Sequence, residues 1–144
     1  MNEKIPIKNY IKTFENLDKD NINTLKKIFD EEIIFRDPFN YTKGILNTIS
    51  IFERMFISLK DPVFSVKEYG VSNTNKKKYF LSWELSGKFK NSSKSVKIEG
   101  LSEVTFNLDG KAISHVDYWD SLSQLLIKLP KIGLVINYFK KKFL

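Results

Sequence analysis

The sequence contains no cysteine and only one histidine, and these two features exclude several kinds of chemistry. Without cysteine there is no disulfide framework, no thiolate metal ligand and no cysteine nucleophile. With His115 alone, neither a multi-histidine metal site nor a catalytic pair of histidines can form. We therefore expect no metal and no cofactor, so that any chemistry must use carboxylates, hydroxyls, amides, lysine or arginine.

Arginine is also scarce, although the chain is basic. Its 24 Lys+Arg against 17 Asp+Glu give a net charge of +7, but only Arg36 and Arg54 are arginines. Nucleic-acid readers usually carry arginine, whose planar guanidinium pairs with phosphates and guanine edges. The lysine run at 76–78 follows the polar residues 73–75, which indicates a solvated turn rather than a phosphate site. We therefore expect no nucleic-acid partner.

Long hydrophobic runs are missing as well. No stretch approaches the roughly 18 apolar residues that a membrane span requires. Residues 1–12 lack the apolar core of a secretion signal, so we expect a cytoplasmic protein. A chain of 144 residues with 42% hydrophobic and 14% aromatic residues is long and apolar enough for one domain with a true core.

The spacing of apolar residues predicts helices first and strands afterwards. Three- and four-residue spacing predicts helices over 7–17, 22–29 and 45–59, with a short strand that ends at Pro38. Alternation then predicts strands near 64–71, 79–89, 96–106 and 113–119, the last two joined by an Asp109-Gly110 turn. This order predicts an α+β fold, in which helices pack on one face of a curved antiparallel sheet.

The same alternation places several polar side chains on the inner faces of strands, among apolar neighbours. They are Asp37, Ser102, His115 and Asp117, the last two on one face with Ile113 and Trp119. A buried carboxylate is costly, so it must become neutral, find a partner or do chemistry. Polar groups that converge in an apolar cavity are typical of a ligand site. Glu84, Glu99 and Glu103 fall on the opposite, solvated faces.

Two segments carry a resemblance to a known superfamily. One is Phe35-Arg36-Asp37-Pro38 followed by Gly44 and a helix with Ile49 and Phe52; the other is residues 106–111 followed by His115-Val116-Asp117-Tyr118-Trp119-Asp120. Together they resemble the nuclear transport factor two-like, or SnoaL-like, superfamily over about residues 6–129. Its members include ketosteroid isomerase, polyketide cyclases, limonene epoxide hydrolase and scytalone dehydratase. The resemblance implies a cone of helices over a strongly bent sheet.

The resemblance also implies roles for individual residues. Asp37 matches the general base of ketosteroid isomerase, and Asp117 resembles an aspartate of the acid–base triad in limonene epoxide hydrolase. Ser102 stands where the isomerase has its oxyanion-hole aspartate, and Tyr10 lies a turn from the position of its tyrosine. The epoxide hydrolase's arginine and second aspartate have no clean counterpart near 82–84, so neither catalytic set is complete.

These features lead to two hypotheses of function. In the first, the protein is a cofactor-free isomerase, cyclase, dehydratase or hydrolase acting on a small apolar molecule. Asp37 is then the base, Asp117 and His115 are the acid or orienting groups, and the pocket is lined by Tyr10, Phe52, Phe56, Trp83, Ser102 and Trp119. In the second, the same cavity binds a lipid-like ligand or a protein partner without catalysis.

Structural roles remain open for each candidate residue. Asp37 can serve only to cap the turn before Pro38, and Asp117 can serve as an acceptor for Tyr10 or for a backbone amide. His115 can be a histidine whose hydrogen bonds are satisfied within the strand. Trp83 and Trp119 can belong either to the core or to the wall of the pocket.

The C-terminal segment is distinctive. We expect residues 1–129 to form the cone domain and residues 130–144 a basic amphipathic helix that packs on it or extends from it. Apolar residues at 132, 135, 136, 139 and 143 form one stripe, and Lys140, Lys141 and Lys142 follow at the end. The stripe fits packing over the mouth of the cone, contact within a homodimer, or peripheral contact with the inner membrane surface. Lysines there also complement the helix dipole.

Overall fold

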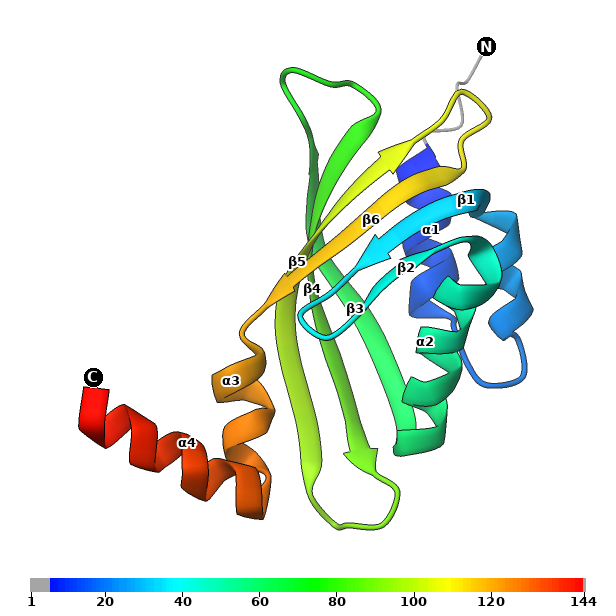
Figure 1. Cartoon of the computed structure of the whole chain (residues 1–144). Helices are drawn as coiled ribbons and strands as arrows, with labels where there is room; N and C mark the ends of the chain where they lie inside the picture. The colour runs from blue at the N-terminus through cyan, green and yellow to red at the C-terminus, as the bar shows by residue number, and fades with distance from the viewer. Residues whose placement is uncertain (1–5, 144) are drawn as a thin grey trace.

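The computed structural model describes residues 6–143 and shows a strongly curved sheet with two helices against its concave face (Figure 1). Residues 1–5 and 144, which the expected boundaries include, lie outside the described residues. The helical elements are α1 (Pro6–Glu15), η1 (Ile22–Lys27), α2 (Ile45–Ser58), α3 (Ser121–Gln124), η2 (Leu126–Lys128) and α4 (Pro130–Phe143). The strands are β1 (Phe29–Arg36), β2 (Tyr41–Lys43), β3 (Leu59–Val71), β4 (Lys78–Phe89), β5 (Ser95–Phe106) and β6 (Ala112–Trp119).

The six strands form one sheet in the order β2-β1-β6-β5-β4-β3. The predicted α+β class is therefore confirmed, but the sheet is mixed rather than wholly antiparallel. Its single parallel pair is β1 with β6, which brings Phe35 opposite His115. A parallel pair needs a long crossover connection, and here the whole chain from β2 to β5 supplies it.

The core lies between the two helices and the concave face of the sheet. Helix α1 buries Ile7, Tyr10 and Phe14, and α2 buries Ile49, Phe52 and Phe56, as their helical spacing predicts. From the sheet side, Phe29, Phe35 and Phe106 are almost completely buried. Glu15 closes the end of α1 against β3, because its Oε1 accepts a 2.9 Å hydrogen bond from the Val66 amide.

Local structure differs from the sequence prediction in two places. The predicted helix over 22–29 is a short 3₁₀-helix, η1, and Phe29 already belongs to β1. Between the strand that ends before Pro38 and the helix that follows, the structure contains a strand that was not predicted, β2, which pairs with the end of β1. These elements are too short to show a clear period in the sequence.

A bulge in β6 decides which of its residues face the core. Phe106 pairs with Ala112 and Thr105 with Ser114, so Ile113 has no partner in the β5 ladder. Ala112 and His115 therefore both point inward, whereas Ile113 is 39% exposed. The prediction that Ile113 shares the inner face with His115 and Asp117 is wrong, because simple alternation does not hold across the bulge.

The C-terminal residues 121–143 form an arm that projects from the cone (Figure 1). Helix α4, predicted within residues 130–144, begins at Pro130 and packs through Gly133 on the backbone of Ile127, where a side chain has no room. Beyond that contact α4 extends away from the domain and does not cover the mouth of the cone. None of the helices within residues 6–143 is long and apolar enough to cross a bilayer.

A substitution at Gly100 tests how the sheet accommodates Trp83. A Cβ atom at Gly100 would overlap the Trp83 indole ring, whereas a Cβ at Gly70 would meet no atom within 4 Å. We expect Gly100→Ala to lower the free energy of unfolding by about 1–3 kcal/mol, as overpacking does. Gly70→Ala, the control, should leave it unchanged or raise it slightly. Urea denaturation measures both, and equal effects of the two variants would refute the packing described here.

Candidate active site

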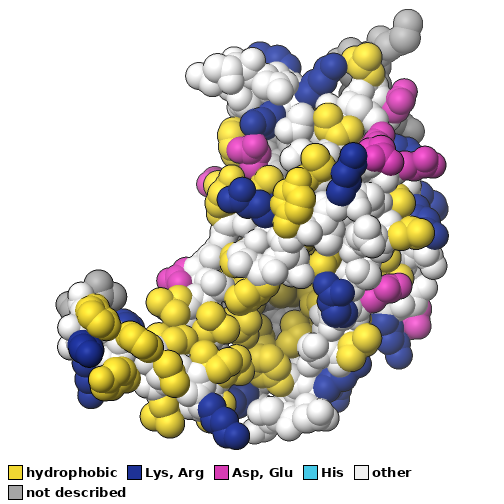
Figure 2. Space-filling view, viewed as in Figure 1, with side chains coloured by type: hydrophobic (Ala, Val, Ile, Leu, Met, Phe, Trp, Pro, Cys, Tyr) yellow, Lys and Arg dark blue, Asp and Glu magenta, His cyan; other side chains and the backbone are white. Residues whose placement is uncertain are grey.

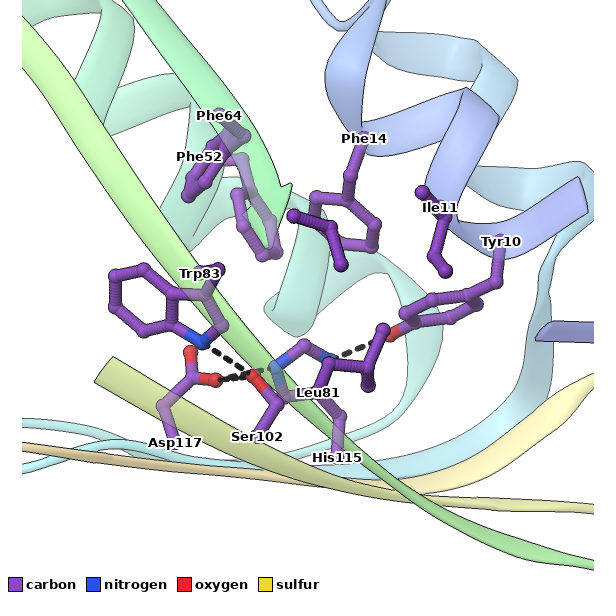
Figure 3. Close-up of a pocket in the computed structure, with 11 residues that line it drawn as sticks. Tyr10, Ile11, Phe14, Phe52, Phe64, Leu81, Trp83, Ser102, His115 and Asp117 are labelled. Carbon is purple, nitrogen blue, oxygen red and sulfur yellow. Dashed lines mark hydrogen bonds and ion pairs between the residues drawn. The ribbon is translucent and has the colours of Figure 1, made fainter. Parts of the chain in front are cut away.

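Five side chains form a continuous chain of hydrogen bonds inside the cone (Figure 3). Trp83 Nε1 donates to Ser102 Oγ at 2.8 Å, and Ser102 Oγ in turn donates to Asp117 Oδ1. The same Asp117 oxygen lies 2.6 Å from His115 Nε2. On its other side the imidazole Nδ1 is hydrogen-bonded to the Tyr10 hydroxyl. The network thus runs from helix α1 across the core to strand β4.

Each hydrogen bond in this network is donated along the chain of groups in the direction of Asp117. A carboxylate only accepts, so His115 Nε2 carries a proton and donates it to Oδ1. A neutral imidazole then has a free lone pair on Nδ1, which accepts from the Tyr10 hydroxyl. This arrangement uses every polar hydrogen of the five side chains, and no buried side-chain nitrogen or oxygen among the described residues lacks a partner.

Strand register explains why these side chains meet. Ser102 on β5 lies directly opposite Asp117 on β6, at the distance where cross-strand side chains interact. Trp83 on β4 lies opposite Gly100, and the missing side chain there lets the indole cross β5 towards Ser102. His115 reaches the same face two residues before Asp117, beyond the β6 bulge. The curved sheet therefore positions four of the five groups, and α1 supplies the fifth.

Asp117 has one oxygen in the network and one outside it. Oδ1 accepts from both Ser102 and His115, whereas Oδ2 accepts no hydrogen bond from the described residues. Because no buried polar atom there is left without a partner, Oδ2 retains contact with open space. The Asp117 side chain is 15% exposed, and it lines two cavities inside the cone as well as an open groove beside Arg36 and Asp37.

Two cavities inside the cone meet at Asp117. The inner one has a volume of about 40 Å³ and lies between α1 and the sheet, against Tyr10, Ser102 and His115. The outer one has about 400 Å³, which suits a small ligand, and opens at the wide end of the cone. Its wall is mostly apolar and aromatic, including Phe35, Phe39, Phe52, Phe64, Phe89 and Trp119. Phe52, Phe64, Trp83 and Asp117 line both cavities.

The surroundings of Tyr10 shift the pKa of its phenol. The side chain is 2% exposed, and its burial raises the pKa of the phenol well above its ordinary value of 10.0. The negative charge of Asp117 raises this pKa further. Tyr10 therefore stays protonated and keeps donating to His115 throughout the physiological range.

Asp37 is placed differently from Asp117, although it also lines the outer cavity. Its Oδ1 accepts 2.7 Å hydrogen bonds from the amides of Phe39 and Asn40, and the Asn40 side chain binds both carboxylate oxygens at 3.0 Å. These bonds hold the turn between β1 and β2. Both oxygens of Asp37 thus take part in holding the turn, Oδ2 through one hydrogen bond only, and Asp37 makes no hydrogen bond with the Asp117 network.

The other residues expected in the pocket fall into three groups. Phe52 and Trp83 line both cavities, and Trp119 lines the outer one, with its ring edge-on to Phe39. Phe56 is buried in the core and lines neither cavity. Phe39 and Arg54 at the outer cavity were not predicted, since both are exposed and neither follows an apolar period. Among residues 6–143, no three His, Asp or Glu side chains lie close enough to hold a metal ion.

Comparison with known proteins identifies the fold and then the family. The fold is that of nuclear transport factor two-like proteins. An NTF2-like protein of unknown function from Exiguobacterium sp. 255-15 is 21% identical, with a TM-score of 0.67, over 80% of this chain and 98% of that one. A protein with a ketosteroid isomerase-like fold from Catenulispora acidiphila, solved with trimethylamine, is 13% identical, with a TM-score of 0.71, over 85% and 90%.

An epoxide hydrolase of the LEH-like type from M. tuberculosis is 11% identical, with a TM-score of 0.66, over 94% of this chain and 89% of that one. Solved structures of the same fold also include a putative SnoaL-like polyketide cyclase and a steroid delta-isomerase. No protein of curated function matches the sequence. Residues 8–115 match the model of a family described as uncharacterized conserved protein, DUF2358, and the chain belongs to that family.

The raised pKa of Tyr10 predicts a pH dependence of stability. Above about pH 10 the unfolded chain loses the phenol proton while the folded chain keeps it, so folding stability falls as pH rises. One such proton contributes a slope of about 1.4 kcal/mol per pH unit. Tyr10→Phe should lower stability near neutral pH, because Nδ1 of His115 loses its donor, but should flatten the curve above pH 10.

Urea denaturation between pH 8 and 11 measures this difference. Tyr138→Phe, at a tyrosine that is 61% exposed, is the matched control and should retain the wild-type slope. Identical slopes for wild type and Tyr10→Phe would show that Tyr10 is not held protonated by the fold.

Proposed function

We propose that the protein binds a small, mainly apolar molecule in the outer cavity and removes a proton from it with Asp117. The observation that carries this proposal is that Asp117 lines an apolar cavity with Oδ1 anchored by Ser102 and His115 and with Oδ2 accepting no hydrogen bond from the described residues. A carboxylate held in a fixed orientation beside an apolar cavity is placed to take a proton from a molecule bound there.

The network suits this role. When Asp117 accepts a proton on Oδ2, Oδ1 keeps its two hydrogen bonds, so the reaction requires no rearrangement of the site. Preorganised groups of this kind lower the cost of charge movement during catalysis. Tyr10 and Trp83 act as positioning residues, since each binds a neighbour of Asp117 rather than Asp117 itself.

Isomerisation, dehydration, cyclisation and hydrolysis all include the removal of a proton by a base. The base takes this proton either from the substrate or from a water molecule. The fold alone does not choose among them. Structures with this fold carry names that include a putative polyketide cyclase, an epoxide hydrolase and a steroid delta-isomerase, and these names support the proposal of an enzyme.

A non-catalytic ligand-binding protein is the second candidate function. It is favoured by the state of Asp37, whose oxygens are already bound within the turn. Asp117 is then the only carboxylate at the cavity with an oxygen not engaged by the described residues. The outer cavity then binds its ligand through apolar contacts and one hydrogen bond to Asp117 Oδ2.

The Kemp elimination of 5-nitrobenzisoxazole tests the proposal directly, because it requires only an apolar pocket and a base. The base removes the proton on C3, the nitrile forms as the N–O bond breaks, and the coloured nitrophenolate leaves. We expect the protein to accelerate this reaction over an equal concentration of acetate. Asp117→Asn should lower kcat/KM about 100-fold or more, as loss of a general base does.

Two further variants make the result specific. Asp109→Asn, in the exposed β5–β6 turn, is the control and should leave kcat/KM unchanged. Asp37→Asn should lower kcat/KM less than tenfold, since its oxygens are bound by Phe39 and Asn40. Quenching of tryptophan fluorescence by the probe without any acceleration would favour the binding protein, and equal activity of Asp117→Asn and wild type would refute Asp117 as the base.

A further inference from the structure

The arm formed by residues 121–143 leaves an apolar surface uncovered. Six of its large apolar side chains are 44–74% exposed: Ile132, Leu134, Val135, Tyr138, Phe139 and Phe143. Figure 2 shows apolar side chains running from the arm formed by α3 and α4 into the hollow of the cone. Proteins that remain alone in water rarely expose a continuous apolar patch of this kind, so the surface indicates an interaction site.

The base of the arm is fixed to the cone. The Gln124 side chain binds the backbone of Glu99 in β5 twice, accepting from its amide at 2.6 Å and donating to its carbonyl at 3.0 Å. Asp120 caps α3 by accepting a 3.0 Å hydrogen bond from the Ser123 amide. Gly133 then seats α4 against Ile127. The exposure of α4 therefore follows from how the arm is anchored.

The charges on the arm identify what it binds. Residues 121–144 contain no Asp or Glu, and they contain five lysines: Lys128, Lys131, Lys140, Lys141 and Lys142. At 3.6 residues per turn, Ile132, Val135, Phe139 and Phe143 fall within an arc of about 80°. Lys142 lies on one side of this arc and Lys140 on the other. Tyr138 lies beyond Lys142, where an aromatic ring with a polar tip fits an interface.

We propose that α4 attaches the protein to the surface of an anionic lipid bilayer. The helix lies in the plane of the interface, with Ile132, Val135, Phe139 and Phe143 among the upper acyl chains. The flanking lysines extend their ammonium groups to the lipid phosphates, while their methylene stems cover apolar surface. A second copy of the chain would cover the apolar stripe equally well, but it would bring together two arms that carry only positive charge.

Vesicle flotation of the full chain tests this proposal. We expect binding to vesicles of phosphatidylcholine with 30% phosphatidylserine, no binding to phosphatidylcholine alone, and release at 0.5 M salt, since salt screens exposed charges. The triple variant Lys140→Gln, Lys141→Gln, Lys142→Gln should bind the anionic vesicles about 100-fold more weakly, at about fivefold per lysine. Phe139→Asp should abolish binding, because it places a charge in the apolar stripe.

A charge-matched control separates the arm from the general basicity of the chain. Lys8→Gln, Lys76→Gln, Lys77→Gln also removes three exposed lysines, but from α1 and the β3–β4 loop, and should bind like wild type. Circular dichroism confirms folding of each variant, and Kemp activity on the soluble probe should not change in any of them. The vesicle assay therefore tests the membrane proposal, and the activity assay separately tests the proposal that Asp117 is the base.

Two results would overturn the membrane assignment. One is equal binding, or no binding, to neutral and anionic vesicles. The other is a stable dimer in analytical ultracentrifugation that Phe139→Asp converts to monomer, together with no flotation. In that case the arm is an interface between two copies of the chain.

Discussion

Keeping the charge of Asp117 inside an apolar cone is the constraint on which the rest of the site depends. A carboxylate taken from water into such surroundings costs several kcal/mol unless hydrogen bonds compensate for the lost hydration. Here Ser102 and His115 compensate at a single oxygen, and Trp83 and Tyr10 each hold one of them in place. The network links α1 to three adjacent strands. Packing of the core and hydrogen bonding of its buried polar groups therefore stabilise the same arrangement.

Asp117 accepts hydrogen bonds at one oxygen only, and this makes the network a candidate site rather than a purely structural one. Asp37 is hydrogen-bonded at both oxygens and stabilises its own turn. Asp117 differs because its Oδ2 accepts no hydrogen bond from the described residues and the residue lines a cavity with apolar and aromatic walls. The site is therefore acidic and internal, although the chain as a whole carries a net charge of +7. The basic excess belongs to the surface and, at the C-terminus, to the arm.

Much of this could be predicted from the sequence, because it depends on local periods. Alternation along β4 and β5 places Trp83 and Ser102 on the inner face, and the stripe on α1 buries Tyr10. What could not be predicted depends on pairing between distant segments. The parallel β1–β6 pair and the bulge that turns Ile113 outward are set by how strands meet, not by either strand alone.

The different outcomes for the two aspartates have the same origin. Both alternate with apolar neighbours, and the pattern does not distinguish them. The turn after Asp37 presents the amides of Phe39 and Asn40 to its carboxylate, a feature of loop geometry that no period encodes. Likewise, the stripe on α4 predicts an amphipathic helix but not its partner, which depends on how Gln124 and Gly133 anchor the arm.

The protonation of His115 tests the central claim most directly. As the only histidine in the chain, it gives a single pair of ¹⁵N imidazole signals in nuclear magnetic resonance. At pH 7.5 the account predicts a protonated Nε2, which donates to Asp117, and an unprotonated Nδ1, which accepts from Tyr10. A proton resident on Nδ1, or two equivalent nitrogens that exchange freely, would contradict it, since Asp117 would then lose the donor that holds its Oδ1.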